Sequence, residues 1–511
     1  MNSVKEMSLH SISEKTLFND KLIKSIIKTS VKNSLIRKAL LNLLDKTIYN
    51  YAVKKNLDGL AEEAALNKYY MGRALVKTID RIYENGSMSE GYKDNLLNVI
   101  IGNNLVKGLT KKREFLDNDL HQPFFILIDP TSNCNLNCKY CYADAGKRGK
   151  SYKGYSFSYK DLTRIMDEAR EQLDIKFFVF SGGEPSIWQG EDEFGNKKNI
   201  ADIFEEYSDT FFLMYTNGTA LDKLYARKHN LPDNLVERFA KSGNVIPCLS
   251  KEGKKSDTNK RRGTADEEDL STIVSRVAKD MKEAGVPFLY SVTITSKNAE
   301  YVGSAEFHDK NLEEGAMGEW NFHVMPIGRI WNNDGKIIPE EIMGLLVTPE
   351  QRNKLYINNW KYVRDKGVFV GDFWNSGSTT ANIDCPAGCI AAGRTGGHFT
   401  IRANGKITPC VFLPLCDKEL GNIYDVWEKG KTFNDIIECK LFKRIREEIQ
   451  KVNMNYKLPC SIRDNFELLQ KIVYDGVADY FDEGTKELFN DPELSKRFIQ
   501  NSNECKKIMH P

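Results

Sequence analysis

Apolar residues recur at helical spacing through the first part of the chain. The stripe over residues 21–44 places apolar side chains three and four positions apart, and similar spacing continues over about residues 60–85 and 90–108. The same stretch shows little of the alternation that is typical of strands. The pattern predicts an N-terminal helical domain over residues 1–118.

From Pro123 onward the pattern changes, because short apolar runs alternate with helical stretches. The runs that we predict to be strands cover residues 124–128, 177–180, 210–215, 245–249, 288–295 and 320–325. Strands that alternate with helices form parallel sheets with right-handed crossovers, and six strands are too few for a closed eight-stranded barrel. The predicted fold class is therefore α/β, with a partial (β/α)6 parallel barrel over residues 119–335.

The first predicted strand leads into a loop that contains Cys134, Cys138 and Cys141, spaced C-x3-C-x2-C. A [4Fe-4S] cluster needs four ligands, usually thiolates, so these three would leave one iron open to a ligand that is not protein. A zinc site would favour a C-x2-C pair followed by a second Cys/His pair, and none follows here. Buried unreactive thiols are the other alternative.

The three cysteines and Tyr140 match a C-x3-C-x-aromatic-C signature, and the chain resembles the radical S-adenosylmethionine (SAM) superfamily. The resemblance implies that the open iron binds the amino and carboxylate groups of SAM. It implies an enzyme, an oxidoreductase or a transferase, that reductively cleaves SAM to a 5′-deoxyadenosyl radical and abstracts hydrogen from an unactivated carbon. The three cysteines are its expected catalytic residues.

Further motifs follow the strands at their carboxyl ends, where ligands of parallel α/β folds gather. The stretch 181–185 resembles the family's GGE motif, in which Gly182, Gly183 and Glu184 would contact the amino group of SAM. The stretch 216–218 resembles the family's T-N-G turn, and an ordinary Asn-Gly turn is the alternative.

Two further strand ends carry cofactor candidates. Ser250 and Arg262 stand where the family has S-x-D-G and R-G motifs that bind the SAM carboxylate or ribose, although Glu252 replaces the aspartate. Ser291 could meet the ribose or be an ordinary strand residue. His323, near the end of the last predicted strand, is either a packed core residue or a group that contacts substrate or moves a proton.

More cysteines lie beyond residue 335. Cys385 and Cys389 precede a predicted hairpin over residues 397–410, with Asn404-Gly405 as a two-residue turn signal. The arrangement resembles the SPASM/twitch extension of radical SAM enzymes, which holds an auxiliary iron-sulfur cluster. The ligands expected for one auxiliary cluster are Cys389, Cys410 and Cys460, with Cys385 or Cys416 as the fourth. Free buried thiols are the alternative, and Cys248, Cys439 and Cys505 are expected to be structural.

The predicted extension covers residues 336–470, and a C-terminal helical tail covers residues 471–511. A formal net charge of +2 gives no global field that favours nucleic acid. The chain shows no signal-peptide order and no long uncharged apolar run. We therefore expect a cytoplasmic protein. The basic stripe over residues 21–44 is either a solvated helix face or a peripheral membrane contact.

The resemblance also implies an electron donor such as a ferredoxin or flavodoxin. The substrate is left open among lipid chains, ribosomal peptides and small molecules. Residues 1–115 show no sign of the three-stranded sheet that many peptide-modifying relatives carry. An electron carrier with two clusters is the alternative from another class, although a carrier needs no amine-binding motif beside its cluster.

Overall fold

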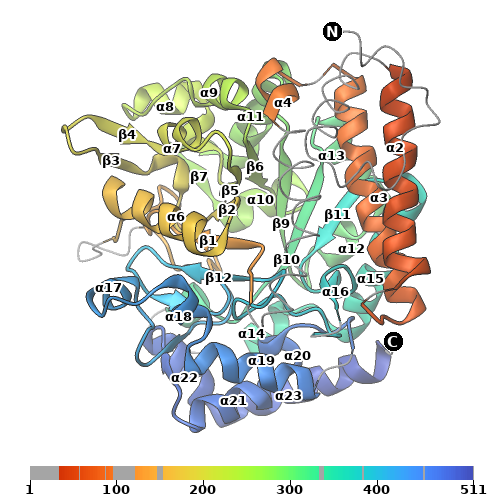
Figure 1. Cartoon of the computed structure of the whole chain (residues 1–511), viewed down its shortest axis with the longest axis vertical. Helices are drawn as coiled ribbons and strands as arrows, with labels where there is room; N and C mark the ends of the chain where they lie inside the picture. Colours follow the sequence, from red (N-terminus) through yellow and green to blue (C-terminus); the bar gives the residue numbers. More distant parts are fainter. Residues whose placement is uncertain are drawn as a thin grey trace.

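The computed structural model describes most of the chain. The described residues are 34–56, 58–86, 88–95, 121–146, 154–332, 339–382, 385–452 and 455–509. Helices and strands alternate through the middle of the chain and enclose one central sheet (Figure 1). The C-terminal helices gather at one end of the molecule, and two long N-terminal helices lie along one side (Figure 1).

The central sheet contains the six strands that the sequence predicts. They are β1 (Phe125–Ile128), β2 (Phe177–Phe180), β5 (Phe211–Thr216), β6 (Val245–Ser250), β9 (Leu289–Ile294) and β10 (Gly318–His323). All neighbours among them pair in parallel, in the order β10-β9-β6-β5-β2-β1. Their burial on both faces explains the nearly continuous apolar runs. The partial parallel barrel is confirmed.

Three strands from later in the chain extend this sheet. β11 (Phe369–Asp372) pairs in parallel with β10, and β12 (His398–Ile401) pairs in parallel with β1. β13 (Ile407–Thr408) pairs antiparallel with β12, which confirms the predicted hairpin. Because these strands lie beyond residue 335, the sheet crosses the predicted domain boundary, and the boundaries themselves stay predictions.

The hairpin turn differs from its prediction. Arg402 N donates to Lys406 O at 2.8 Å, and Gly405 N donates to Arg402 O at 2.8 Å, so three residues separate the paired positions instead of two. Gly405 has φ +81°, a left-handed conformation that glycine adopts without the steric cost of a Cβ. A three-residue turn of this kind also ends on a left-handed glycine, so the Asn-Gly signal located the turn but not its length.

Amphipathic helices cover the outer face of the sheet. The larger ones are α6 (Tyr159–Leu173), α7 (Ile200–Glu206), α9 (Leu235–Ser242), α11 (Leu270–Ala284), α13 (Ala305–Glu313) and α15 (Pro349–Lys366). In α6, Leu162, Ile165, Met166 and Ala169 are fully buried, as the sequence predicts. Ser158 caps this helix by accepting from Asp161 N at 3.0 Å.

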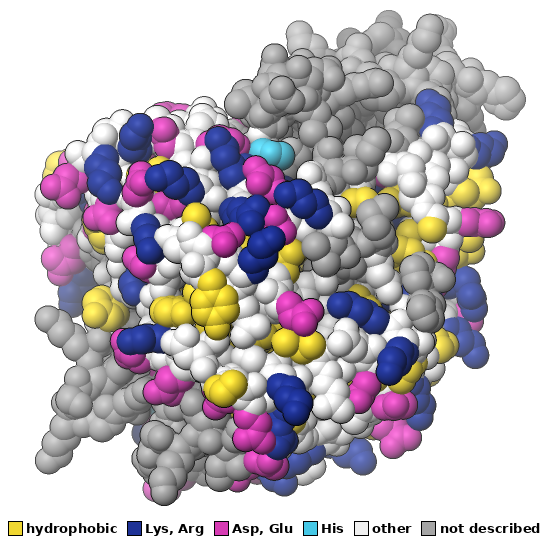
Figure 2. All heavy atoms as spheres, turned by 90° about the horizontal axis from the view of Figure 1, so that it is seen from below, with side chains coloured by type: hydrophobic (Ala, Val, Ile, Leu, Met, Phe, Trp, Pro, Cys, Tyr) yellow, Lys and Arg dark blue, Asp and Glu magenta, His cyan; other side chains and the backbone are white. Residues whose placement is uncertain are grey.

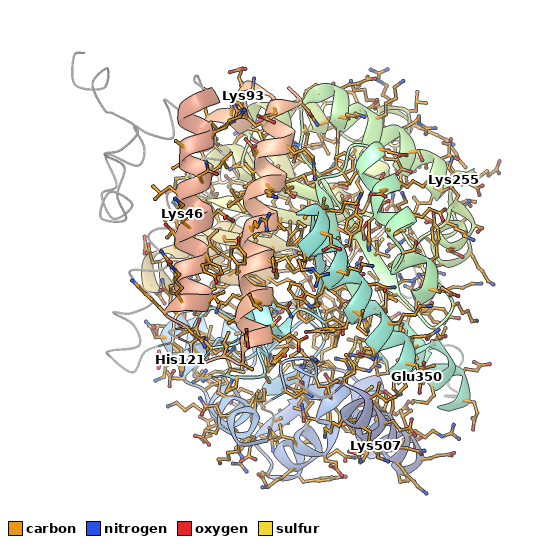
Figure 3. The ribbon with its side chains drawn as sticks, turned by 90° about the vertical axis from the view of Figure 1, so that its right-hand side faces the viewer. Lys46, Lys93, His121, Lys255, Glu350 and Lys507 are labelled. Atoms are coloured by element: carbon orange, nitrogen blue, oxygen red, sulfur yellow. The ribbon has the colours of Figure 1, made fainter. Side chains whose placement is uncertain are left out.

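The described N-terminal residues are helical, as predicted. α2 (Ser34–Tyr49) and α3 (Glu62–Glu84) lie side by side, and α4 (Glu90–Asn95) follows (Figure 3). α3 runs beside the edge strand β11, where Thr78 Oγ1 accepts from Phe369 N at 3.3 Å. Most of the basic stripe over residues 21–44 lies outside the described residues. Within it, Arg37 is paired with Asp80 at 2.9 Å and Glu84 at 2.8 Å.

The C-terminal part adds a two-stranded sheet and a group of helices. β14 (Leu415–Asp417) pairs antiparallel with β15 (Ala478–Tyr480). The helices are α17 (Ile423–Glu428), α18 (Phe433–Ile437), α19 (Lys440–Val452), α20 (Ser461–Asp464), α21 (Phe466–Tyr474), α22 (Glu483–Asn490) and α23 (Pro492–Ile508). On the face of the molecule beneath these helices, basic and acidic side chains are interspersed (Figure 2).

Candidate active site

The three cysteines of the first loop lie beside one large cavity at the carboxyl ends of the parallel strands. Cys134, Cys138 and Cys141 are all partly exposed and all line this cavity, whose volume is about 830 Å³. Burial raises the pKa of the Cys134 and Cys138 thiols. Neighbouring amides reach the first sulfur, with Leu136 N 3.5 Å and Asn217 Nδ2 3.8 Å from Cys134 Sγ.

Arg329, which follows β10, binds the backbone of the cysteine loop. Its backbone N donates to Cys141 O at 2.8 Å, and its guanidinium donates to Cys138 O at 2.5 Å. The same guanidinium also contacts Ala145 O and pairs with Asp144 at 3.3 Å. Nothing in the local sequence distinguishes this arginine from other loop arginines, so it was not among the predicted site residues.

The GGE motif packs directly on the cysteine loop. A Cβ added at Gly183 would lie 2.0 Å from Asn133 O, so only glycine permits this approach. Gly182 has φ +102°, and a Cβ there would lie 2.6 Å from Thr131 O. Both glycines line the cavity, but their first structural role is to let the loop and the strand end meet.

Glu184 joins the GGE motif to the T-N-G turn. Its buried carboxylate accepts from Thr216 Oγ1 and Asn217 N, each at 2.6 Å, and from Ser186 N at 3.1 Å. Burial raises the pKa of Glu184, and these hydrogen bonds oppose that shift. Thr216 and Asn217 of the T-N-G turn line the cavity, and so does Glu184.

Glu252 has a definite role despite replacing the family's aspartate. Its buried carboxylate pairs with Arg262 Nε and Arg261 Nη1, each at 2.6 Å, and accepts from Thr293 N at 3.0 Å. Arg262 lies close enough to Cys138 to oppose the burial that raises the pKa of that thiol. Glu252 thus binds two arginines that lie near Cys138 of the cysteine loop. Ser250 and Ser291 line the same cavity.

The second cysteine group lines this cavity as well. Cys389, Cys410 and Cys460 all appear in its wall. Burial raises the pKa of Cys410, and the nearby Cys389 and Cys460 raise it further. Cys385 lies next to this group, with its Sγ 3.6 Å from Cys389 O. Cys416 sits on β14 opposite Asp479 and lines neither this cavity nor a smaller one beside Cys385.

Cys460 is positioned by Asp464, which lies four residues further along the chain. Asp464 Oδ2 accepts from Cys460 N at 2.9 Å, and Asp464 pairs with Arg352 through contacts of 2.5 and 3.1 Å. Arg463 is also buried, and its guanidinium nitrogens have no partner among the described residues. Two buried guanidinium groups against one carboxylate leave positive charge beside Cys460, which fits an anionic iron-sulfur cluster.

His323 lines the same cavity as the two cysteine groups. Its Nε2 is 3.2 Å from Asp372 Oδ2, and its ring stacks on Trp374 with centroids 5.4 Å apart. Its Nδ1 is buried without a partner in the described part of the chain. Burial lowers the pKa of His323. The sequence did not point to Asp372 as its partner, because 49 residues separate the two.

Within the described residues, no three His, Cys, Asp or Glu side chains converge closely enough for a single metal ion. The thiolates of a four-iron cluster bind different irons and stand farther apart than the ligands of one ion. The absence of such a group among the described residues therefore applies to sites for one ion and not to cluster sites. None of the described helices combines the length and hydropathy that crossing a membrane requires.

Comparison with known proteins identifies the family. The model of the radical SAM superfamily matches residues 128–303. A cysteine-type anaerobic sulfatase-maturating enzyme of Clostridium perfringens (strain ATCC 13124) is 23% identical over 64% of this chain and 86% of its own length. The sporulation killing factor maturation protein SkfB of Bacillus subtilis (strain 168) is 25% identical over 60% of this chain and 64% of its own length.

Two solved structures align with most of the chain. Native anSMEcpe with bound AdoMet aligns over 75% of this chain and 100% of its own, with 19% identity and a TM-score of 0.48. Streptococcus suis SuiB bound to S-adenosylmethionine aligns over 66% of this chain and 74% of its own, with 18% identity and a TM-score of 0.45. The family model places a radical SAM domain over residues 128–303, and together with the curated relatives it identifies the chain as a radical SAM enzyme.

Proposed function

We propose that Cys134, Cys138 and Cys141 bind the [4Fe-4S] cluster at which this enzyme reductively cleaves SAM. When bound, the cluster supplies an open iron for SAM and the electron that splits it, and the 5′-deoxyadenosyl radical then abstracts hydrogen from an unactivated carbon of the substrate. The observation that supports these ligands is their shared exposure to one cavity, with Arg262 beside them. A ferredoxin or flavodoxin is the proposed electron donor.

The SAM site proposed around this cluster uses the strand ends. Glu184 and the backbone of Gly182 and Gly183 face the amino group, and Arg262 offers a guanidinium to the carboxylate. The remaining residues that we assign to SAM are Tyr140, Ser250 and Ser291. All seven line the same cavity. The proposed SAM site is thus built from the ends of several strands, which hold its residues more rigidly than a single loop would.

We assign the auxiliary cluster to Cys385, Cys389, Cys410 and Cys460. The first of these is preferred over Cys416 because Cys385 lies against Cys389, whereas Cys416 faces β15. The unpartnered Arg463 supports an anionic group at this place. Iron content and the g-values of the reduced protein in single Cys→Ala variants distinguish the two candidates.

Glu184→Ala is expected to weaken SAM binding by about 1.5 to 3 kcal/mol, the usual worth of a hydrogen bond to a charged group. The measurement is SAM affinity of the reconstituted protein by equilibrium binding under anaerobic conditions, together with the yield of 5′-deoxyadenosine after dithionite. Glu191→Ala is the control, because Glu191 is an exposed residue on β3 (Gln189–Glu191). Unchanged affinity in Glu184→Ala would assign Glu184 to the turn alone.

Peripheral membrane contact through residues 21–44 stays a prediction. Arg37 already pairs with two carboxylates, so we assign the contact to Lys21, Lys24, Lys28, Lys32 and Lys38, each worth about 1 kcal/mol near an anionic surface. The protein is expected to co-sediment with anionic vesicles at low salt and to be released at high salt. Replacing the five lysines by glutamine should abolish binding, and the same change at Lys496, Lys506 and Lys507 should not. No binding at low salt would refute the contact.

A further inference from the structure

The cavity that both cysteine groups line continues along the inner face of the central sheet. Its walls there are formed by strand side chains that point to the same face of the sheet, as every second residue of a strand does. These residues are Phe125, Leu127, Val179, Leu213, Leu289 and Trp320. Polar lining residues such as Ser250, Ser291 and Thr293 lie further along their strands, toward the SAM site. The cavity is thus polar at one end and apolar at the other.

The N-terminal helices complete the apolar end. Leu44 and Ile48 of α2 and Leu75 and Ile79 of α3 line the cavity, and Figure 3 shows these two helices lying along this side of the molecule. Arg37 and Asp80 of the same helices also line it, and they pair with each other. In closed barrels the interior is filled by layers of side chains. Here the sheet is open, and instead of filled layers a cavity remains between its inner face and the two helices.

The cavity reaches solvent at its apolar end. Leu75 is 41% exposed and Phe124 is 44% exposed, and both also line the cavity. Large apolar side chains at an entrance favour an apolar ligand, because they bury surface against it as it enters. The volume of about 830 Å³ covers the whole cavity, the SAM site and both cysteine groups included, so the apolar end takes up only a part of it.

We infer that the substrate carries a long aliphatic chain, which lies in the apolar end of the cavity and presents one carbon to the SAM site. This inference rests on the proposed function. A peptide in this part of the cavity would bring an N–H and a C=O with every residue, and apolar walls cannot pair them. An alkyl chain brings none. In the transfer, one substrate C–H bond breaks, one C–H bond forms at C5′, and the unpaired electron moves to the substrate carbon.

Binding of straight-chain alcohols to the reconstituted holoprotein tests the inference. Uncharged alcohols of increasing length are measured by competition with a fluorescent long-chain alcohol. Affinity should rise about fourfold with each added methylene until the cavity is full, the ratio that ~0.8 kcal/mol per buried methylene gives. Leu75→Glu should weaken binding of the longer alcohols at least tenfold. Leu224→Glu is the matched control, since Leu224 is 65% exposed on α8 (Lys223–Lys228) and does not line the cavity.

The outcomes distinguish a failure of the aliphatic substrate from a failure of the proposed function. Formation of 5′-deoxyadenosine from SAM and dithionite, without substrate, should be the same in both leucine variants. If it occurs but affinity does not depend on chain length, or Leu75→Glu binds like the control, the aliphatic substrate is wrong and the function stands. Competition by short unstructured peptides instead of alcohols would assign the cavity to a peptide. If the wild-type protein forms no 5′-deoxyadenosine, the proposed function itself fails, whatever binds.

Discussion

The triple variant Cys134→Ala, Cys138→Ala, Cys141→Ala is expected to lose about four of roughly eight irons per chain, because each of the two proposed clusters holds four. It should form no 5′-deoxyadenosine with dithionite and SAM. The physical reason is that these three thiolates are the proposed protein ligands of the SAM-binding cluster, and without them none of its irons is held by the protein. Iron and sulfide content after anaerobic reconstitution, with the electronic spectrum of the reduced protein, measures the loss.

The auxiliary group provides the controls for this variant. Cys416→Ala should keep all roughly eight irons, whereas Cys385→Ala should lose up to about four while keeping the SAM-binding cluster. A triple variant that keeps its full iron content would overturn the assignment of the first loop. A Cys416→Ala variant that loses iron would exchange the two candidates for the fourth auxiliary ligand.

Local patterns predicted the elements of this fold well, because parallel strands buried on both faces leave a clear mark. Phe177–Phe180 was located to the residue, since an isolated apolar run between two helical stretches has few other interpretations. β11 and β12 were missing from the predicted barrel, although the hairpin that contains β12 was predicted. Their place beside β10 and β1 depends on long-range pairing, which no local period encodes.

The sequence allows candidate site residues to be proposed where a motif concentrates the chemistry in a few consecutive residues. The first cysteine loop and the GGE stretch are of this kind. Arg329 and Asp372 were missed because each acts through a partner distant in sequence, the cysteine loop in one case and His323 in the other. Glu252 looked like a departure from a pattern, and only its two arginine partners show what the longer side chain does.

The pair formed by Arg352 and Asp464 connects the fold to the auxiliary site. Both side chains are 1% exposed, and the same carboxylate receives the backbone N–H of Cys460. Removing one partner of a buried ion pair leaves the other charge without compensation in a poorly solvating interior. Breaking such pairs costs about 3–5 kcal/mol, whereas replacing both partners with apolar residues is often neutral.

Asp464→Asn is therefore expected to destabilise the cluster-free protein by about 3–5 kcal/mol, because Arg352 and Arg463 would then be buried with no carboxylate beside them. The shift of the guanidinium unfolding midpoint, at an unchanged slope, measures the loss. Asp475→Asn is the control, since Asp475 pairs with Arg444 at 2.9 Å on the surface and should cost at most about 1 kcal/mol.

The double variant Arg352→Met, Asp464→Leu separates the charge effect from lost packing. It should recover much of the stability that Asp464→Asn loses, because no unpaired partner of the ion pair is left. It should still bind less auxiliary iron than the wild type, since Cys460 no longer has its carboxylate acceptor. If Asp464→Asn matched the surface control in stability, the buried pair would not hold this part of the fold, and the placement of Cys460 would depend on the proline before it.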